Sequence, residues 1–370
     1  MNKKFSHILA VHKRGLQELH KVSPKLFPLI TFSAIVSALI PYVTVFFSAQ
    51  ILKELALQRR ADVLWKWVIV SVSSMGTMAI LSAFLKRRFE TLFNDVWGRK
   101  EILFCRKAFS LDYADVDKQE TLDLRNQIIQ NENWAGWGLC RVPEFYEQII
   151  RSVIGILSGI TLTVSLFSSP VPESAGWLTI LNHPLFIVGI LGVLLAVTLT
   201  GPALGSKATS VWGSLAEESR FGNRLFSHFG YYLTADKEKA LDLRMYRQLD
   251  LAEHYSAVNL FGVGSHFAKL NATTIGICGG MSVAVSAILS GVVYVFVCLK
   301  ALGGAFGIGS VTQYVSAVTK LAGNVSSLLQ TVGHMRTNAG FLKTVYEFLD
   351  IPNSMYQGSL TTEKRADRQY

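Results

Sequence analysis

The sequence has few charged residues and few cysteines for its length. Only 17% of the 370 residues are charged, whereas 50% are hydrophobic. A soluble domain of this size could not cover so much apolar surface, so the composition excludes an ordinary water-soluble protein. The 4 cysteines are far apart and form no CxxC or metal-ligand spacing. We therefore interpret them as small apolar side chains.

Long apolar runs dominate the chain instead. They occupy 27–52, 63–85, 148–169, 184–206, 270–299 and 305–333. A helix needs about 20 apolar residues to cross about 30 Å of hydrocarbon, and each run is long enough. The sequence therefore predicts an all-α membrane protein whose six transmembrane helices form three hairpins. The intervals between hairpins, 86–147 and 207–269, are too long for structureless loops.

The net charge of +10 is unevenly placed along the chain. Lys and Arg concentrate in the first 25 residues and in the two long intervals, whereas the loop 170–183 has none. This positive-inside bias predicts an integral membrane protein with cytoplasmic N- and C-termini, which we expect in the plasma membrane of a bacterium. It also indicates attraction to membrane lipid rather than binding of nucleic acid.

The first 25 residues differ from the rest of the chain. They combine apolar residues at helical spacing with Lys, His and Arg, which predicts an amphipathic helix at the membrane interface over 1–25. Pro24 and Pro28 mark the elbow into the first span.

Both long intervals are expected to be helical extensions into the cytoplasm. In the first interval, a helical spacing that begins at Phe89 predicts a helix to about Leu111, followed by a short helix capped near Asp115 or Asp117. In the second, the helix is interrupted over 230–246 and returns from about 238. At 1.5 Å per residue, such extensions reach about 40 Å beyond the bilayer and end in two tips.

These features together resemble the transmembrane domain of an ATP-binding-cassette (ABC) exporter. The resemblance is carried by LDYADVDKQETLDL (111–124), YYLTADKEKALDLRMY (231–246), GIGSVTQYVSAVT (307–319) and FLKTVYEFLDIP (341–352). It implies a six-helix exporter domain over 26–350, with one coupling helix at each tip. It also implies that 351–370 is a linker towards a nucleotide-binding domain that the sequence does not contain.

The resemblance implies that both tips contact nucleotide-binding domains. The residues concerned are Tyr113, Asp115, Val116 and Asp117 in the first tip, and Tyr232, Leu233, Asp236 and Lys237 in the second. An exposed apolar tip needs a partner to cover it. The alternative is that each tip is a plain solvent-exposed turn.

The sixth span is unusually polar, and an ionisable residue in a membrane helix tends to face a cavity or a partner. Lys320 and Asn324 are four residues apart and share one helix face. Alternatively, Lys320 reaches the interface and the Ser and Thr residues join helices. Our candidates for a substrate pathway are Gln313, Ser316, Lys320, Asn324 and Ser327, with Tyr42 in the first span.

Small residues in the third span predict a different feature, a close approach of two helices. Gly155 and Gly159 form a GxxxG pair, which lets helix backbones come together in lipid.

The sequence has no recognisable ATP-binding or catalytic motif. The string nearest to a phosphate-binding loop, GPALGSKAT (201–209), has the wrong spacing, and LSG at 157–159 and 289–291 lies inside apolar runs. We therefore expect no enzyme activity, cofactor or metal in this chain. ATP and Mg are expected in nucleotide-binding domains, on the same full-length chain or on a separate subunit.

The expected function is that of the membrane-spanning half of an ATP-driven exporter. It would dimerise with a second transmembrane domain and couple ATP hydrolysis to alternating access for a peptide, a lipid or an amphiphilic drug. One rival is an ion-coupled secondary carrier, which would require Asp or Glu within the spans. Another is a scaffold that binds a soluble partner through its tips.

Overall fold

A computed structural model describes residues 2–57, 60–228, 238, 240–257 and 264–354, and within these residues it contains helices and no β-strand. The helices of the first half are α1 (Asn2–Val22), α2 (Leu26–Leu57), α3 (Ala61–Phe109), α4 (Tyr113–Val116), α5 (Gln119–Ala135) and α6 (Arg141–Ser168). Those of the second half are η1 (Glu173–Asn182), α7 (Pro184–Ser227), α9 (Ala240–Met245), α10 (Gln248–Ala257), α11 (His266–Leu270), η3 (Asn271–Ile275), α12 (Gly276–Leu302) and α13 (Ile308–Leu349).

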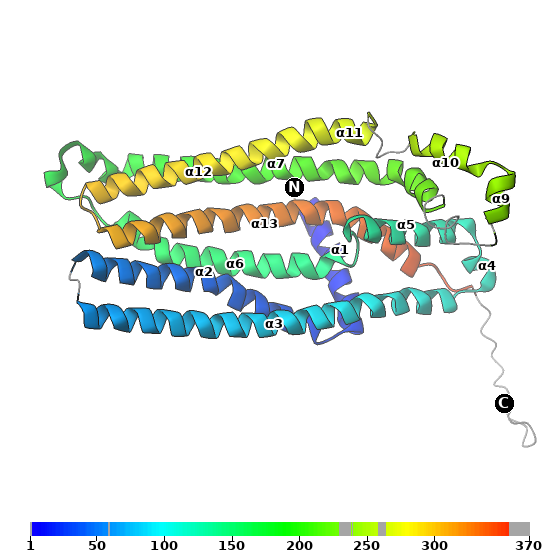
Figure 1. Ribbon diagram of the computed structural model, residues 1–370, viewed down its shortest axis with the longest axis horizontal. Helices are drawn as coiled ribbons and strands as arrows, with labels where there is room; N and C mark the ends of the chain where they lie inside the picture. The colour runs from blue at the N-terminus through cyan, green and yellow to red at the C-terminus, as the bar shows by residue number, and fades with distance from the viewer. Residues whose placement is uncertain (1, 58–59, 229–237, 239, 258–263, 355–370) are drawn as a thin grey trace, which may run out of the picture.

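The long helices α2, α3, α6, α7, α12 and α13 run lengthwise beside one another, and α1 crosses them obliquely (Figure 1). At one end of the bundle α2 turns into α3, α6 into α7 and α12 into α13; we call this the hairpin end. The opposite end carries α4 and α9, and we call it the tip end. The predicted three-hairpin order is therefore present.

Five of the described helices are long and apolar enough to cross a membrane. They are Leu26–Ala56, Ala61–Phe109, Arg141–Ser168, Pro184–Val211 and His266–Leu302. These helices indicate a membrane protein. The sixth expected span, in α13, lies alongside them, but its many polar residues leave it outside this group. A sixth transmembrane helix therefore stays a prediction.

The five candidate spans form a belt without charged residues in the middle of the bundle, whereas α13 carries Lys320 there. These spans contain no Asp, Glu, Lys or Arg over 26–52, 67–85, 152–168, 184–206 and 270–299. Many of the belt's large apolar side chains point outward, such as Ile80, Leu185 and Val283. An exposed apolar surface of this extent fits contact with lipid.

The structure confirms some predicted boundaries and corrects others. Helix α3 continues past the belt to Phe109, close to the predicted end. However, α4 is capped by Asp112, whose side chain accepts from the Ala114 amide, and not by Asp115 or Asp117. Asp112 takes this role because its backbone is extended while its carbonyl already accepts the first helical bonds.

The return from the second tip also differs from the expected continuous helix. Helix α9 ends at Met245, and Arg247 has a positive φ of 47° before α10 begins. A left-handed residue cannot continue a right-handed helix, so the return is divided into separate pieces.

Two apolar clusters hold the bundle together. One lies towards the hairpin end and joins α6, η1, α7, α12 and α13, with Leu166, Val297 and Tyr314 among its members. The other joins α1, α2, α3, α5, α6 and α13, and includes Leu19 and Leu342. The apolar face of α1 thus packs against protein, whereas its location at a membrane interface stays a prediction.

The predicted close approach at the GxxxG pair is confirmed between α6 and α13. A Cβ atom on Gly155 would overlap the Asn324 amide, and one on Gly159 would lie 2.9 Å from the Leu321 Cβ. We call this contact the α6–α13 seam. Because each glycine lacks a side chain, the two helices can approach more closely than larger residues would allow.

Candidate functional site

The first tip is a short, internally bonded turn. Asp115 accepts from Lys118 Nζ at 2.6 Å and from the Ser354 hydroxyl, and its backbone carbonyl accepts from Thr121 Oγ1 at 2.7 Å. The hydrogen bonds from Lys118 and Ser354 lower the pKa of Asp115. Its carboxylate therefore holds the tip to the segment that leaves α13 and does not project freely towards a partner.

Two aromatic residues of this tip do project outward. The predicted contact residue Tyr113 is 80% exposed, and Phe109 at the end of α3 is 86% exposed. Val116 is half-buried and Asp117 is exposed. Sequence reasoning missed Phe109, although a large apolar residue at the end of a solvent-exposed extension was the available signal.

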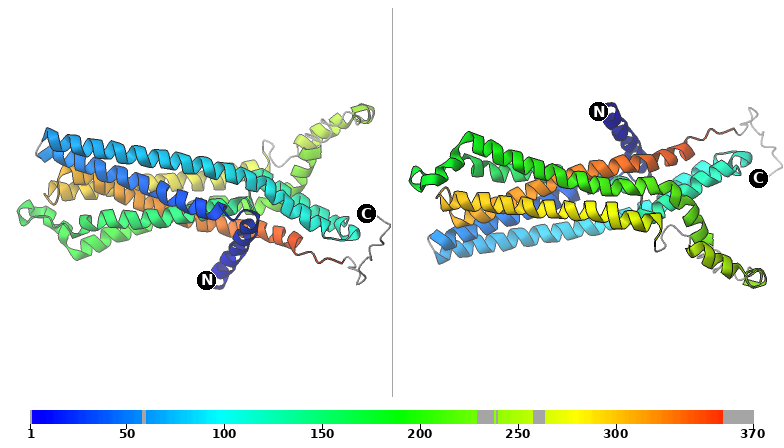
Figure 2. Two further views of the ribbon diagram at one scale, coloured as in Figure 1. Left: turned by 90° about the horizontal axis from the view of Figure 1, so that it is seen from below. Right: turned by 90° about the horizontal axis from the view of Figure 1, so that it is seen from above.

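The predicted contacts of the second tip, Tyr232, Leu233, Asp236 and Lys237, lie outside the described residues. The neighbouring α9 presents exposed apolar side chains from Leu241 and Met245, followed by Tyr246. Figure 2 shows that α9 and α10 diverge from α4 and α5. The described parts of the intervals 86–147 and 207–269 thus present their exposed apolar side chains on two separate parts of the tip end.

Two of the predicted pathway residues meet inside the bundle. The Tyr42 hydroxyl donates to the Gly155 carbonyl at 2.6 Å, and Asn324 Nδ2 donates to the Tyr42 hydroxyl at 2.8 Å. Tyr42 is only 5% exposed. These contacts join α2, α6 and α13, which favours packing for this pair over contact with a substrate. Their role in a pathway stays a prediction.

The other predicted pathway residues are less enclosed. Ser327 bonds to Gln148 of α6. The side chains of Gln313, Ser316 and Lys320 are partly exposed, and within the described residues they make no hydrogen bond. Of the six predicted pathway residues, three are therefore hydrogen-bonded within the bundle: Tyr42, Asn324 and Ser327. The other three, Gln313, Ser316 and Lys320, remain accessible.

An open apolar groove of about 380 Å³ lies between α2 and α6. Tyr42, Phe46 and Phe47 line one side and Leu162 the other, while Ser158 and Thr161 contribute hydroxyl groups. The Thr161 hydroxyl is bonded to the Leu157 carbonyl of its own helix, so it offers little polarity to a ligand. The groove suits an apolar chain or ring.

A buried ionic contact joins α3 to α5 near the tip end. Lys100 is 2% exposed and donates to Glu132, and its Nζ is 3.3 Å from the Cys140 sulfur. The Trp97 ring centroid is 4.4 Å from the same nitrogen. Sequence reasoning missed this cluster because its members are far apart along the chain.

Burial controls the chemistry of this cluster. It raises the pKa of Glu132, and it raises the pKa of Cys140 to about 12. A thiol with so high a pKa stays protonated, so Cys140 is a poor nucleophile and a poor metal ligand. We therefore regard the cluster as a structural connection.

Two kinds of ligand site were considered among the described residues, a metal site and a phosphate-binding loop. These residues contain no group of three or more His, Cys, Asp or Glu side chains that could hold a metal ion. The string 201–209, considered above as a phosphate-binding loop, is helical throughout and lies inside α7. It therefore lacks the loop conformation whose amides could surround a phosphate.

Comparison with known proteins identifies no relative. No protein-family model matches the chain, and no curated protein matches it. Over the residues that the structure describes, the fold supports a helical protein with five helices able to span a membrane.

Proposed function

We propose that the chain is the membrane-spanning half of an ATP-driven exporter of the ABC type. Two such halves would enclose the substrate pathway, and their tips would transmit ATP hydrolysis from nucleotide-binding domains to the helices. ATP and Mg would be held by those domains. The sequence resemblance suggests this mechanism, and the geometry of the first tip supports it.

The supporting observation is the pair of exposed aromatic residues far from the belt. The part of α3 from Lys86 to Phe109 extends about 36 Å at 1.5 Å per residue. Phe109 and Tyr113 therefore lie too far from the belt for lipid to cover them. A soluble protein partner is the surface that suits them, and the rigid α3 would carry its movement to the belt.

The groove between α2 and α6 bears on the substrate. Its lining is mainly aromatic and aliphatic, with hydroxyl groups from Ser158 and Thr161 and no charged side chain. An amphiphilic or lipid-like substrate is therefore a better match than a highly charged one. Gln313, Ser316 and Lys320 are the polar candidates for such a pathway. The uncharged belt segments contain no Asp or Glu, and nothing in them favours an ion-coupled carrier.

Cross-linking in native membranes tests the proposal. In a background in which the exposed Cys105 and Cys298 are changed to Ser, a Tyr113→Cys variant is labelled with a thiol-linked photo-cross-linker, and ATP-binding polypeptides are labelled with azido-ATP. The expected product joins position 113 to an azido-ATP-labelled domain. Trp65→Cys, an exposed position near the hairpin end, is the matched control and should give no such product.

The alternative outcomes are distinct. If position 113 cross-links only to a protein without azido-ATP label, the chain is a scaffold and the exporter proposal is wrong. If the labelled domain is part of a longer version of this chain, peptide mapping will place both labels on one polypeptide.

A further inference from the structure

One face of α1 carries basic side chains into solvent. Lys13 and Lys21 are exposed, and so is Lys25 in the elbow before α2. The opposite face is packed into the bundle through His12 and Leu19. Helix α1 therefore has a protein side and a basic outer side.

A second basic group lies on the neighbouring helix. Lys86, Arg87 and Arg88 of α3 are all exposed and follow directly after the uncharged segment 67–85. Leu19 of α1 belongs to the same apolar cluster as the next turns of α3, so the two helices pack together here. We call Lys13, Lys21, Lys25, Lys86, Arg87 and Arg88 the α1–α3 basic surface.

This surface has a large excess of positive charge. Its acidic neighbours are Glu18, bonded to Lys21 at 3.0 Å, and Glu90, 3.9 Å from Lys86. The hairpin end is more balanced, because its cations are mixed with acidic residues. There, five cations (Lys53, Arg59, Arg60, Lys66 and Lys300) accompany three acidic residues (Glu54, Asp62 and Glu173), and Lys300 is buried. Positive charge is thus concentrated at one edge of the belt.

The position of the charges indicates their ligand. Lys25 directly precedes the uncharged segment 26–52, and Lys86 directly follows 67–85. Cations at the boundary of an apolar belt lie at the level of lipid headgroups. Lys and Arg side chains there bind anionic lipid phosphates through charge and hydrogen bonds.

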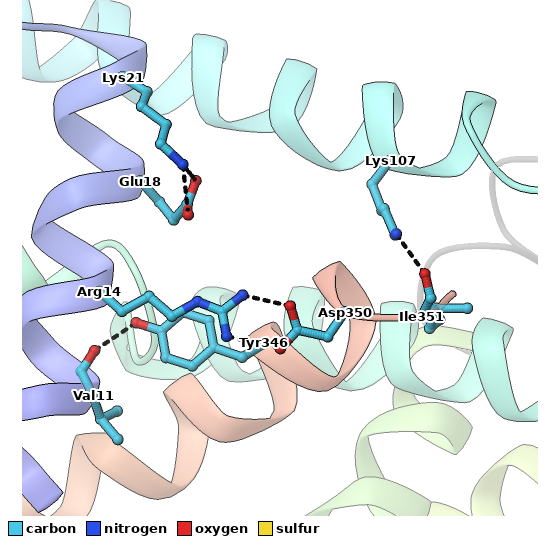
Figure 3. A network of polar contacts seen from close by, with 8 residues as sticks. All are labelled: Val11, Arg14, Glu18, Lys21, Lys107, Tyr346, Asp350 and Ile351. Carbon is cyan, nitrogen blue, oxygen red and sulfur yellow. Dashed lines mark hydrogen bonds and ion pairs between the residues drawn. The ribbon is translucent and has the colours of Figure 1, made fainter. Parts of the chain in front are cut away.

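The protein side of α1 holds the end of α13 (Figure 3). Arg14 forms a two-pronged ion pair with Asp350 at 2.5 and 2.7 Å, and its guanidinium lies 4.3 Å from the Tyr346 ring centroid. The Tyr346 hydroxyl donates to the Val11 carbonyl at 2.7 Å. If α1 is held in place, these contacts will therefore also restrict movement of the C-terminal end of α13, which we call the exit of α13.

The residues that follow α13 are also bonded to the part of α3 that extends beyond the belt. Lys107 Nζ of α3 donates to the Ile351 carbonyl at 2.6 Å, as Figure 3 shows. Helix α1, the end of α13 and the first tip are thus linked by direct contacts.

We propose that the α1–α3 basic surface is a binding surface for anionic lipid headgroups, and that lipid bound there restrains the exit of α13 through α1. The partner is a membrane surface rich in anionic phospholipid. The proposal requires that the belt lies in a membrane, and it does not depend on ATP-driven transport.

Amide hydrogen exchange of the full chain in lipid nanodiscs tests this surface. One set of nanodiscs contains phosphatidylcholine, and the other adds phosphatidylglycerol in equal amount. We expect exchange in α1 and in the last turn of α13 to slow at least threefold with phosphatidylglycerol. The seam glycines of α6 give the internal reference for folding, because exchange there should not change.

The discriminating variant combines Lys13→Gln, Lys21→Gln and Lys25→Gln. The matched control combines Lys53→Gln, Arg60→Gln and Lys66→Gln, which removes the same charge near the hairpin end. Each set includes one exposed ion-paired cation, Lys21 or Arg60. The first variant should lose the effect of phosphatidylglycerol, and the control should keep it.

Two further conditions test whether the bound phosphate belongs to a lipid and whether binding depends on charge. Soluble glycerol phosphate added to phosphatidylcholine nanodiscs should not slow exchange, whereas 0.5 M salt should weaken the effect of phosphatidylglycerol. The proposal is overturned if both lipid mixtures give equal exchange in α1, or if the two triple variants lose the effect equally. Because no ATP is present, failure here would leave the exporter proposal standing.

Discussion

The α6–α13 seam and the belt half of α3 are both uncharged helical surfaces, yet they have opposite environments. In the seam, Gly155 and Gly159 admit the side chains of α13, and Tyr42 is bonded on both sides. On the belt half of α3, Ile80 and Phe84 point outward, and no atom lies within 4 Å of a Cβ built on Gly76. Two helical surfaces of similar hydropathy therefore differ in position: the seam is packed inside the bundle, and this surface of α3 is exposed on the outside.

This difference shows how polar residues are used in the bundle. Tyr42 and Asn324 are bonded to each other where helices meet. Helix α3 buries Ser71 and Leu85 within the belt, and it buries a charged side chain, Lys100, only beyond the belt. Polarity within a span is thus a poor guide to a substrate pathway unless its hydrogen bonds are known. The following predictions pair an enclosed residue with an exposed one of the same type.

The largest effect is expected at Lys100. Lys100→Met removes the cation that accompanies buried Glu132, and loss of one partner from a buried pair costs about 3–5 kcal/mol of unfolding free energy. Lys86→Met is the control, because its side chain is 74% exposed and the expected change is within about 0.5 kcal/mol. Denaturant titration in micelles measures both.

A double variant, Lys100→Met with Glu132→Leu, sharpens this test. It removes both charges and should recover most of the lost stability. Equal losses in Lys100→Met and Lys86→Met would contradict the enclosed position of Lys100.

Overpacking of the seam is the next effect in size. Gly155→Leu drives a side chain into Asn324, and overpacking of this kind costs about 1–3 kcal/mol or more. Gly76→Leu on α3 meets no neighbouring atom and should not destabilise the protein. The same micelle titration compares them, and equal results would mean that the seam is absent.

Tyr42→Phe should cause a smaller loss of about 1–2 kcal/mol. The change leaves the Gly155 carbonyl and one Asn324 proton without the hydroxyl that bonds them. Tyr294→Phe on the exposed side of α12 should be neutral. If Tyr42→Phe leaves stability unchanged but alters the KM of transport, the substrate-pathway assignment is favoured over packing.

The Arg14–Asp350 pair should have the smallest effect. Its side chains are 38% and 58% exposed, so solvent screening limits its contribution to less than about 1 kcal/mol. The hydrogen bond from Arg14 lowers the pKa of Asp350. The pair therefore stabilises the fold above the ordinary Asp pKa of about 3.9, and this is lost as pH falls through the lower, folded-state pKa.

Unfolding titrations of the parent and Arg14→Gln from pH 7 to pH 2.5 test this sign. Their difference in stability should be largest at neutral pH and should shrink at the acid end. Arg99→Gln, which breaks the exposed Arg99–Asp95 pair of α3, provides the control for an ion pair that joins no second helix. A difference that grows on acidification would contradict the assignment.

Hydropathy and helical spacing predicted much of the architecture because both are local properties. The break between α1 and α2, the extension of α3 to Phe109 and the close approach at Gly155 all agree with the sequence-based expectations. The cap of α4 was assigned to the wrong residue, since several aspartates lie close together and only backbone geometry distinguishes Asp112. The interruption at Arg247 had no such local signal.

Apolar runs and helical spacing along the chain were thus enough to predict a helical, membrane-type protein with two long helical intervals between its hairpins. The partners of individual polar side chains depended on packing between distant segments. Asn324 meets Tyr42, Glu132 meets Lys100, and Asp350 meets Arg14 only after the helices have assembled. Such pairs leave no periodic trace in the sequence, because the distance between two helix faces is set by the side chains of every helix around them.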